Sequence, residues 1–281
     1  MGMKKDTNNV ESLLPVYVIN LKKDHNKLAH MQMQFTQLGL KYSRIEAIDG
    51  TCLDRGVIEM RYSEPDAIRT MGRRLTLPEL GTVFSHLSVY ETIIEQQIDM
   101  ALILEDDIII DPTLLTVLGA LGQLPSGWEV VLLGHHPEYS LYRDANSSFW
   151  GSSRMGNKLK CIRFSEFPFG AYGYLISRNG ARKLMHALQK ICEPIDHYTG
   201  NEALVNLYGV SPACIRVHQG LFTQSNLSEE RDRLNTLTRK TIPRHIRLLK
   251  KIPGLVPGLK QLRRFLLRCI FNSHHSRRLP K

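Results

Sequence analysis

The chain has 281 residues, of which 42% are hydrophobic and 23% are charged, a composition that suits a globular domain with a substantial core. Its five cysteines form no CxxC pair, which argues against a zinc ribbon or a redox dithiol and favours reduced thiols in a cytosolic protein. No apolar run approaches the length of a membrane span, and residues 1–20 lack the apolar core of a signal peptide.

The net charge of +10 is distributed unevenly along the chain. Residues 233–281 contain 14 lysines and arginines and no acidic residue, whereas the other 232 residues carry 23 basic and 27 acidic groups. This asymmetry predicts two regions, a main domain over residues 1–232 and a basic tail over residues 233–281.

The first 50 residues contain the pattern of a strand, a helix and a second strand. Residues 15–21 (PVYVINL) are β-branched and aromatic, which predicts a buried strand. Residues 22–40 place apolar side chains at helical spacing, and Gly39 ends the predicted helix. Residues 42–50 (YSRIEAIDG) predict a second strand and a turn. Such a βαβ unit favours a parallel sheet and an α/β fold.

The next segment is expected to be helical and then extended. Weak periodicity in residues 51–74 predicts a loop with short helical pieces, and a long helix follows, capped by Thr76. Residues 101–110 (ALILEDDIII) predict one further strand. We interpret Asp111 as a helix cap rather than a catalytic group, because a proline follows it.

The second half of the chain continues to alternate between strands and helices. Residues 128–134 predict a buried strand, and the polar residues 135–160 predict a mobile surface loop. Three more segments follow: a strand, a turn at Asn179-Gly180 and a helix in residues 169–188, a loop leading into a helix in 193–207, and a last strand and loop in 214–226.

Three consecutive carboxylates, Glu105, Asp106 and Asp107, interrupt the apolar strand. Strand alternation would direct Glu105 and Asp107 to one side and Asp106 to the other. A solvated turn or salt bridges could explain such a triplet, but the hydrophobic residues that follow argue against the tip of a loop. A divalent cation would relieve the repulsion, and oxygen ligands suit Mg²⁺ or Mn²⁺. Because such a cation often bridges carboxylates to a diphosphate, we infer a nucleotide-linked substrate at the carboxyl end of a strand.

Several segments together resemble glycosyltransferase family 25, which includes bacterial lipooligosaccharide β-1,4-galactosyltransferases. They are PVYVINL, AIDG, ELGTVFSHLSVYETI, ALILEDDI, VVLLG and GAYGYLISRNGARKL, and the resemblance covers roughly residues 15–230. It implies a GT-A-like, Rossmann-type fold with a mixed sheet flanked by helices. It also implies inverting transfer of a hexose from a UDP-sugar to a hydroxyl of a lipid-linked lipooligosaccharide or lipopolysaccharide. UDP-galactose is the family's commonest donor, and UDP-glucose remains open.

The resemblance assigns roles to the acidic triplet and the first strand. EDD corresponds to the DxD metal motif, so Asp107 is implied as a ligand of Mn²⁺ or Mg²⁺, Glu105 as its helper at the metal or ribose, and Asp106 as a donor-binding residue. The backbone near Asn20 and Leu21 would face the nucleotide. The family's arginine after this strand is replaced here by two lysines, so that role is not transferred.

The segment ELGTVFSH matches the family pattern E-x-G-x-x-x-S-H and would place Glu79, Ser85 and His86 beside the donor. For Glu79 and Ser85 a helix-end or packing role is the alternative. For His86 the alternative is a hydrogen-bonded histidine of the core.

Inverting transfer needs one base to take the acceptor's proton, and the P-x-D match makes Asp196 the candidate. Asp49 and Glu79 are rivals, and a helix cap is the alternative role for Asp196. In GAYGY, the rings of Tyr172 and Tyr174 could stack on acceptor sugars or belong to the core. The implied metal shell could further include His218, for which a structural role is the alternative.

The basic tail predicts a membrane-bound helix. Residues 254–271 (GLVPGLKQLRRFLLRCIF) place apolar side chains on one helical stripe and basic ones elsewhere, which is typical of an interfacial helix on an anionic bilayer. We therefore expect a peripheral protein on the inner face of the cytoplasmic membrane, with packing of the tail on the main domain as the alternative.

Other classes of protein fit the sequence less well. A nucleic-acid-binding arm is disfavoured because no recognised module or interleaved aromatic residues accompany the charge, so we expect no nucleic-acid partner. A glycoside hydrolase would need two facing carboxylates and no nucleotide. A non-catalytic basic membrane or nucleic-acid-binding protein with a degenerate catalytic domain remains the alternative from another class.

Overall fold

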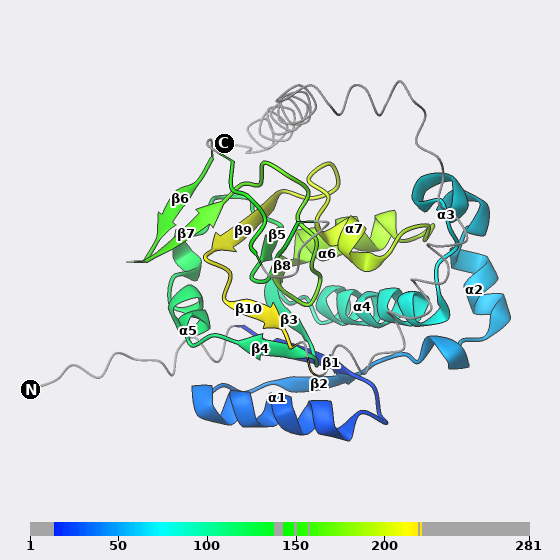
Figure 1. Cartoon of the computed structure of the whole chain (residues 1–281), viewed down its shortest axis with the longest axis horizontal. Helices are drawn as coiled ribbons and strands as arrows, with labels where there is room; N and C mark the ends of the chain where they lie inside the picture. Colours follow the sequence, from blue (N-terminus) through cyan, green and yellow to red (C-terminus); the bar gives the residue numbers. More distant parts are fainter. Residues whose placement is uncertain (1–13, 138–142, 149–150, 157, 219, 221–281) are drawn as a thin grey trace, which may run out of the picture.

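The computed structural model describes residues 14–137, 143–148, 151–156, 158–218 and 220. Within these residues an eight-stranded sheet has the order β2-β1-β3-β8-β5-β9-β7-β6, and β10 and β4 form a second, two-stranded sheet (Figure 1). The strands are β1 (Val16–Asn20), β2 (Ser43–Glu46), β3 (Met100–Glu105), β4 (Ile108–Ile110), β5 (Val130–Leu132), β6 (Ser153–Met155), β7 (Leu159–Ile162), β8 (Gly173–Ser177), β9 (Leu207–Ser211) and β10 (Ile215–Val217).

Helices cover both faces of the main sheet. They are α1 (His25–Leu38), α2 (Arg55–Arg61), α3 (Glu64–Met71), α4 (Leu77–Glu95), α5 (Thr113–Leu118), α6 (Arg178–Ala187) and α7 (Ile195–Thr199), with short 3₁₀ turns at Gly50–Cys52 and Leu121–Gln123. The two short helices α2 and α3 confirm the helical pieces predicted between residues 51 and 74.

The pairing of the strands confirms the predicted parallel unit and the mixed sheet. β1 pairs in parallel with β2 and with β3, whereas β8 runs antiparallel to its neighbours β3 and β5. β5 in turn is parallel to β9. The carboxyl ends of β1, β2, β3 and β5 therefore lie at the same edge of the sheet as the start of β8.

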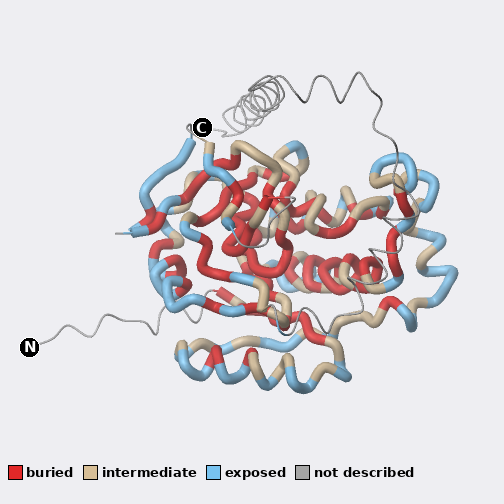
Figure 2. Tube along the Cα trace, viewed as in Figure 1, coloured by how far each residue is buried: buried red, intermediate tan, exposed pale blue. Residues whose placement is uncertain are grey.

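The core has two layers, one on each face of the main sheet, and Figure 2 shows the buried positions along the chain in red. Tyr17 and Ile19 of β1 pack with buried residues of α4, α6 and α7 on one face. Val16 and Val18 pack with buried residues of α1 and α5 on the other face. Burial on both faces explains why this strand is apolar throughout.

The segment ALILEDDIII is two strands, which corrects the prediction of one. β3 ends at Glu105, the chain bends at Asp106 and Asp107, and Ile108 begins β4, which pairs with β10 rather than with the main sheet. The alternation predicted for the triplet is therefore wrong. The carboxylates of Asp106 and Asp107 both lie 3.3 Å from Lys27 Nζ instead of facing opposite sides.

The segment 135–160 was predicted as a mobile surface loop, which is wrong for its described part. It contains β6 and the start of β7, which pair with each other, and Met155 and Leu159 are buried. Pairing of β7 with β9 adds this hairpin to the edge of the sheet.

Two helix boundaries also differ from the predictions. Asn179-Gly180 lies in the first turn of α6, because the Ser177 hydroxyl accepts a hydrogen bond from Gly180 N and caps the helix. The helix predicted within residues 193–207 is the five-residue α7, which begins at Ile195. Asp111, predicted as a cap, lies one residue before Pro112, which is the N-cap of α5, and its carboxylate accepts hydrogen bonds from Thr113 N and Oγ1 at the start of that helix.

The predicted membrane-binding tail, residues 233–281, lies outside the described residues. Among the helices that are described, none combines the length and the apolar character needed to cross a bilayer.

Candidate functional site

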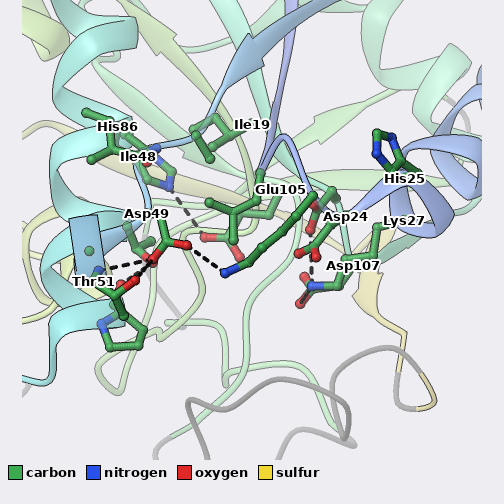
Figure 3. A pocket seen from close by; sticks show the side chains of 18 of the residues that line it. Ile19, Asp24, His25, Lys27, Ile48, Asp49, Thr51, His86, Glu105 and Asp107 are labelled. Atoms are coloured by element: carbon green, nitrogen blue, oxygen red, sulfur yellow. Dashed lines mark hydrogen bonds and ion pairs between the residues drawn. The ribbon is translucent and has the colours of Figure 1, made fainter. Parts of the chain in front are cut away.

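A cavity of about 450 Å³ opens at the carboxyl ends of β1 and β3, where the sequence predicts a ligand site (Figure 3). All three residues of the acidic triplet line it. The rest of its wall comes from the end of β1 and the chain after it, the turn after β2 and the first half of α4: Ile19, Leu21, Lys23, Asp24, His25, Asn26, Lys27, Ala47, Ile48, Asp49, Gly50, Thr51, Pro78, Thr82, Ser85 and His86.

Two glycines let the turn after β2 contact the backbone of α4. A Cβ atom on Gly81 would lie 2.6 Å from Gly50 N, and one on Gly50 would lie 1.7 Å from Leu77 O. Ser85 adds two hydrogen bonds, because its hydroxyl accepts from Ile48 N at 2.8 Å and donates to Gly81 O at 2.7 Å. This contact explains the glycines of AIDG and ELG, and it fixes one wall of the cavity.

Glu79 has a structural position, which corrects its prediction as a donor-binding residue. Its carboxylate accepts two hydrogen bonds from Arg73, at 2.7 and 2.8 Å, and both side chains are buried. It also completes a capping box with Thr76 at the start of α4. It does not line the cavity, so it is also a poor rival for the base.

The acidic triplet is divided between two sets of partners. Asp106 and Asp107 share the ammonium group of Lys27, and Asp106 also accepts a hydrogen bond from Asn20 Nδ2 at 2.7 Å. Glu105 instead lies 3.4 Å from His86 Nε2 across the cavity wall, as Figure 3 shows. The ionisable partners of the three carboxylates are therefore one lysine and one histidine.

Asn20 and Leu21 take different positions at the end of β1. The Asn20 side chain is buried and joins Asp106 to Arg44, which donates to its Oδ1 at 2.9 Å. Leu21 lines the cavity, whereas Asn20 does not. Asn20 thus orients the triplet from behind rather than facing a ligand with its side chain.

The carboxyl groups of the cavity differ in pKa. Burial, followed by the negative charge of Glu105, raises the pKa of Asp107 to about 6. Burial also raises the pKa of Asp106, against the effect of Lys27. A hydrogen bond from Lys23 at 2.6 Å lowers the pKa of Asp49 to about 2. Such a carboxylate is a weak proton acceptor, which disfavours Asp49 as the base.

The donor atoms of the triplet fit a hard divalent cation by type and charge, since they are carboxylate oxygens in excess over cationic side chains. They are not preassembled as a metal site: over the described ranges, no three His, Cys, Asp or Glu side chains are grouped to hold one. A cation between Asp106 and Asp107 would have to displace the Lys27 ammonium.

His218 is the final residue of the predicted metal shell, and the structure brings it next to the triplet. Its backbone N donates to Asp107 O at 2.7 Å, and its ring makes an edge contact with His30, with centroids 5.0 Å apart. This contact follows from the pairing of β10 with β4.

The two tyrosines predicted to bind the acceptor are core residues, which confirms the alternative role. Tyr174 has no exposed surface and hydrogen-bonds through its hydroxyl to His86 and Tyr90. The Tyr172 ring is packed against the backbone of Gly134 and Gly170, where an added Cβ atom would lie 2.2 and 2.6 Å from ring carbons. Neither ring face is available to a sugar.

Asp196 does not line the cavity and does not cap a helix. It is half-buried in the first turn of α7, which begins one residue before it. Its neighbour His197 belongs to a group of half-exposed rings, contacting Phe169 at 5.3 Å, which in turn stacks on His136 at 6.1 Å. Phe169 and His136 pair at the sheet edge that also carries the triplet.

No sequence pattern points to Lys27 or Thr51, and Lys23 stands out only as one of two lysines where the family has an arginine, although all three line the cavity. Each stands in a polar stretch in which any side chain could face solvent. The available signal was positional: Lys27 lies in the first turn of the helix that follows β1, and that turn is at the carboxyl edge of a parallel sheet.

Comparison with known proteins shows the family to which the chain belongs. Residues 13–199 match the model described as "Glycosyltransferase family 25 (LPS biosynthesis protein)", and the chain belongs to this family. The resemblance inferred from the sequence segments is thereby confirmed.

Curated relatives of the chain include galactosyltransferases from animals. The chain is 28% identical to procollagen galactosyltransferase 1-B of Xenopus laevis over 65% of its own length and 30% of that protein. It is 25% identical to procollagen galactosyltransferase 2 of Homo sapiens, over 61% and 27%. A glycosyltransferase 25 family member of Aedes aegypti is 29% identical, over 65% and 30%. The chain thus spans about a third of the length of these relatives.

Proposed function

We propose that the chain is a metal-assisted, inverting glycosyltransferase with a GT-A-like fold, which transfers a hexose from a UDP-sugar to an acceptor hydroxyl. The observation that carries the proposal is the cavity at the carboxyl ends of β1 and β3, lined by two lysines and five acidic side chains that include the triplet. The family supports transfer of a sugar, and the names of the relatives support galactose over glucose.

In this proposal the donor lies along the end of β1, with its nucleotide near Leu21 and the turn after β2. Its diphosphate faces the first turn of α1, where the positive end of the helix dipole favours anions, and the ammonium groups of Lys23 and Lys27. Asp107 and Glu105 would hold Mn²⁺ or Mg²⁺, with His218 as a further candidate ligand. The metal would supply positive charge to the diphosphate when bound.

The transfer forms one bond and breaks one. The acceptor oxygen bonds to the anomeric carbon, the bond from that carbon to the β-phosphate oxygen breaks, and UDP leaves. We assign the acceptor's proton to the carboxylate of Asp196, at the sheet edge where α7 meets the half-exposed rings of His136 and Phe169. These two rings replace Tyr172 and Tyr174 as the surface that an acceptor sugar would contact.

The proposed acceptor is a lipid-linked oligosaccharide of lipopolysaccharide type at the inner face of the cytoplasmic membrane. Support comes from the family's description and from the basic, amphipathic sequence of residues 233–281. A protein acceptor is the second candidate, because the relatives are named procollagen galactosyltransferases.

A donor screen tests this function. The full chain is incubated with UDP-galactose, UDP-glucose, UDP-GlcNAc or UDP-GalNAc in Mn²⁺, Mg²⁺ or EDTA, and UDP release is measured. We expect release from UDP-galactose with a metal and not with EDTA. Equal release in EDTA would overturn the metal role. Failure to bind any UDP-sugar, together with tight and salt-sensitive DNA binding, would favour the non-catalytic alternative.

A further inference from the structure

A chain of hydrogen bonds runs from the core to the cavity. The Tyr90 and Tyr174 hydroxyl oxygens are 2.7 Å apart, the Tyr174 oxygen is 2.8 Å from His86 Nδ1, and His86 Nε2 is 3.4 Å from Glu105 Oε1. The two tyrosines and the histidine have no exposed surface. Glu105 is 28% exposed and lines the cavity, so the chain ends at the candidate donor site.

The burial of Tyr90 fixes the direction of this chain. Among the described residues the Tyr90 hydroxyl has Tyr174 as its hydrogen-bond partner. If Tyr90 accepted from Tyr174, its own proton would be buried without an acceptor, at a cost of about 1–3 kcal/mol. Tyr90 therefore donates to Tyr174, and Tyr174 in turn donates to Nδ1 of His86.

The direction of donation determines the form of His86. With Nδ1 accepting from Tyr174, the ring carries its proton on Nε2 and donates it to Glu105. A proton added at Nδ1 would reverse both tyrosines and leave the Tyr90 hydroxyl without an acceptor. The buried hydroxyls thus favour the tautomer whose Nε2–H is aimed at Glu105.

The surroundings of Glu105 leave the orientation of its carboxylate to the Nε2–H group of His86. The backbone N of Glu105 donates to Tyr172 O at 3.0 Å, which fixes its main chain, and Asp106 and Asp107 are held by Lys27 on the far side of the cavity. Within the described residues, the Glu105 carboxylate has the His86 ring as its side-chain partner. It binds Oε1, so Oε2 remains for a ligand.

We propose that Tyr90, Tyr174 and His86 form a one-way positioning relay, which orients Glu105 as a hydrogen-bond and metal acceptor in the donor site. The inference rests on the proposed function only for the identity of the ligand. In this arrangement Lys27 holds Asp106 and Asp107, whereas the relay holds Glu105. His86 therefore positions Glu105 rather than contacting the donor.

The tautomer of His86 tests the relay without any substrate. Nitrogen-15 NMR of the metal-free full chain reports which ring nitrogen carries the proton, and His86→Gln identifies the signals by their loss. We expect the neutral ring to carry its proton on Nε2. A neutral ring with its proton on Nδ1 would overturn the relay.

Variants link the tautomer to the site. In Tyr174→Phe we expect His86 to lose its single tautomer and UDP binding with Mn²⁺ to weaken by about 10-fold, within the 10–100-fold effect typical of groups that orient metal ligands. Tyr198→Phe is the control, because it removes a buried hydroxyl that bonds to Cys192 instead. An unchanged His86 spectrum in Tyr174→Phe would contradict the proposal.

Substitutions of His86 separate positioning from packing. A glutamine can present an amide N–H near the position of Nε2, whereas a leucine cannot. We expect UDP binding with Mn²⁺ to stay within about threefold of the native value in His86→Gln and to fall by about 10–100-fold in His86→Leu. Equal effects would overturn positioning. If His86→Leu does not fold, the nitrogen-15 NMR measurement of the His86 tautomer in the native chain still tests the relay. The relay can hold even if no UDP-sugar is consumed, so the two proposals fail separately.

Discussion

Lys27 places its ammonium group 3.3 Å from both Asp106 and Asp107, at the point where a diphosphate or a metal would enter. Although burial opposes its charge, the two carboxylates raise its pKa, so it stays protonated. One lysine thus compensates part of the negative charge that the triplet brings into the cavity.

Replacing this lysine should affect the two ligands in opposite directions. In Lys27→Met we expect Mn²⁺ alone to bind several-fold more tightly, because the carboxylates lose a competing cation, and UDP to bind several-fold more weakly in the presence of metal. Manganese electron paramagnetic resonance and calorimetry measure the two affinities. Lys22→Met is the matched control, since Lys22 is exposed and outside the cavity. Equal affinities in both variants would exclude the role of Lys27.

Asp107 should make stability depend on pH in the absence of metal. Its pKa rises to about 6 in the fold, so the folded state binds its proton more tightly than the unfolded state. The stability from this proton is complete below pH 4 and is lost as the pH rises through about 6. Asp107→Asn lacks this loss, so its melting temperature relative to the native chain should increase from pH 4 to pH 7 in EDTA. A constant difference would contradict the assignment.

For single residues, the sequence predicts site residues whose burial in an apolar segment would be costly. It does not predict residues that reach the site only through tertiary contacts. The triplet was found because three carboxylates in an apolar segment need compensation. Lys27 was missed because its partners lie 80 residues away and nothing in KKDHNK separates it from solvent-facing lysines. Tyr174 was assigned to a sugar surface because the pattern GAYGY does not show that both faces of its strand are covered.

Among the contacts between elements, the one between α4 and the turn after β2 leaves the least room for a side chain. The backbones meet at Gly50 and Gly81, without room for a side chain. This contact holds the cavity wall that contains Asp49 and Thr51.

A methyl group at this contact should therefore destabilise the fold. We expect Gly81→Ala to cost about 1–3 kcal/mol, the usual range for overpacking a tight core, and urea unfolding measures it. Gly122→Ala is the control, because an added Cβ there would contact nothing within 4 Å and should leave stability nearly unchanged. A Gly81→Ala variant as stable as the control would show that the turn can move away from α4.

Strand and helix periodicity predicted most elements but not the strand break within the triplet. An apolar run on both sides of EDD looks like one strand, because the sequence does not show that Ile108–Ile110 pairs with Ile215–Val217 in another sheet. The pairing partner lies about a hundred residues further along the chain. The same limit applies to β6 and β7, which are short and set among polar residues.

For the whole molecule, the βαβ pattern predicted a parallel sheet at its start, and the resemblance supplied the mixed sheet. The order of the strands was not predictable, because β8 enters between β3 and β5 and reverses the local direction. This insertion brings Tyr174 next to β3 and so makes the contact between Tyr174, His86 and Glu105 possible.

Charge at this scale predicts membrane attachment through residues 233–281. Their 14 basic residues should bind anionic vesicles, with each cation near the surface contributing about 1 kcal/mol at low salt. The full chain should sediment with phosphatidylserine vesicles in 50 mM salt and be released in high salt, whereas a chain ending at residue 232 should stay in the supernatant. Sedimentation of the truncated chain would place the membrane contact in the main domain instead.

Calorimetry of UDP binding in Mn²⁺ tests whether the cavity with the acidic triplet binds the donor nucleotide, without knowledge of the acceptor. The comparison is between the native chain, Asp107→Ala and Asp111→Ala, since the Asp111 carboxylate bonds to Thr113 at the start of α5, outside the cavity. We predict at least 10-fold weaker binding in Asp107→Ala and unchanged binding in Asp111→Ala, as expected for loss of a direct metal ligand. Equal binding of UDP by all three proteins would show that UDP binds without the Asp107 carboxylate and would contradict a donor site in this cavity.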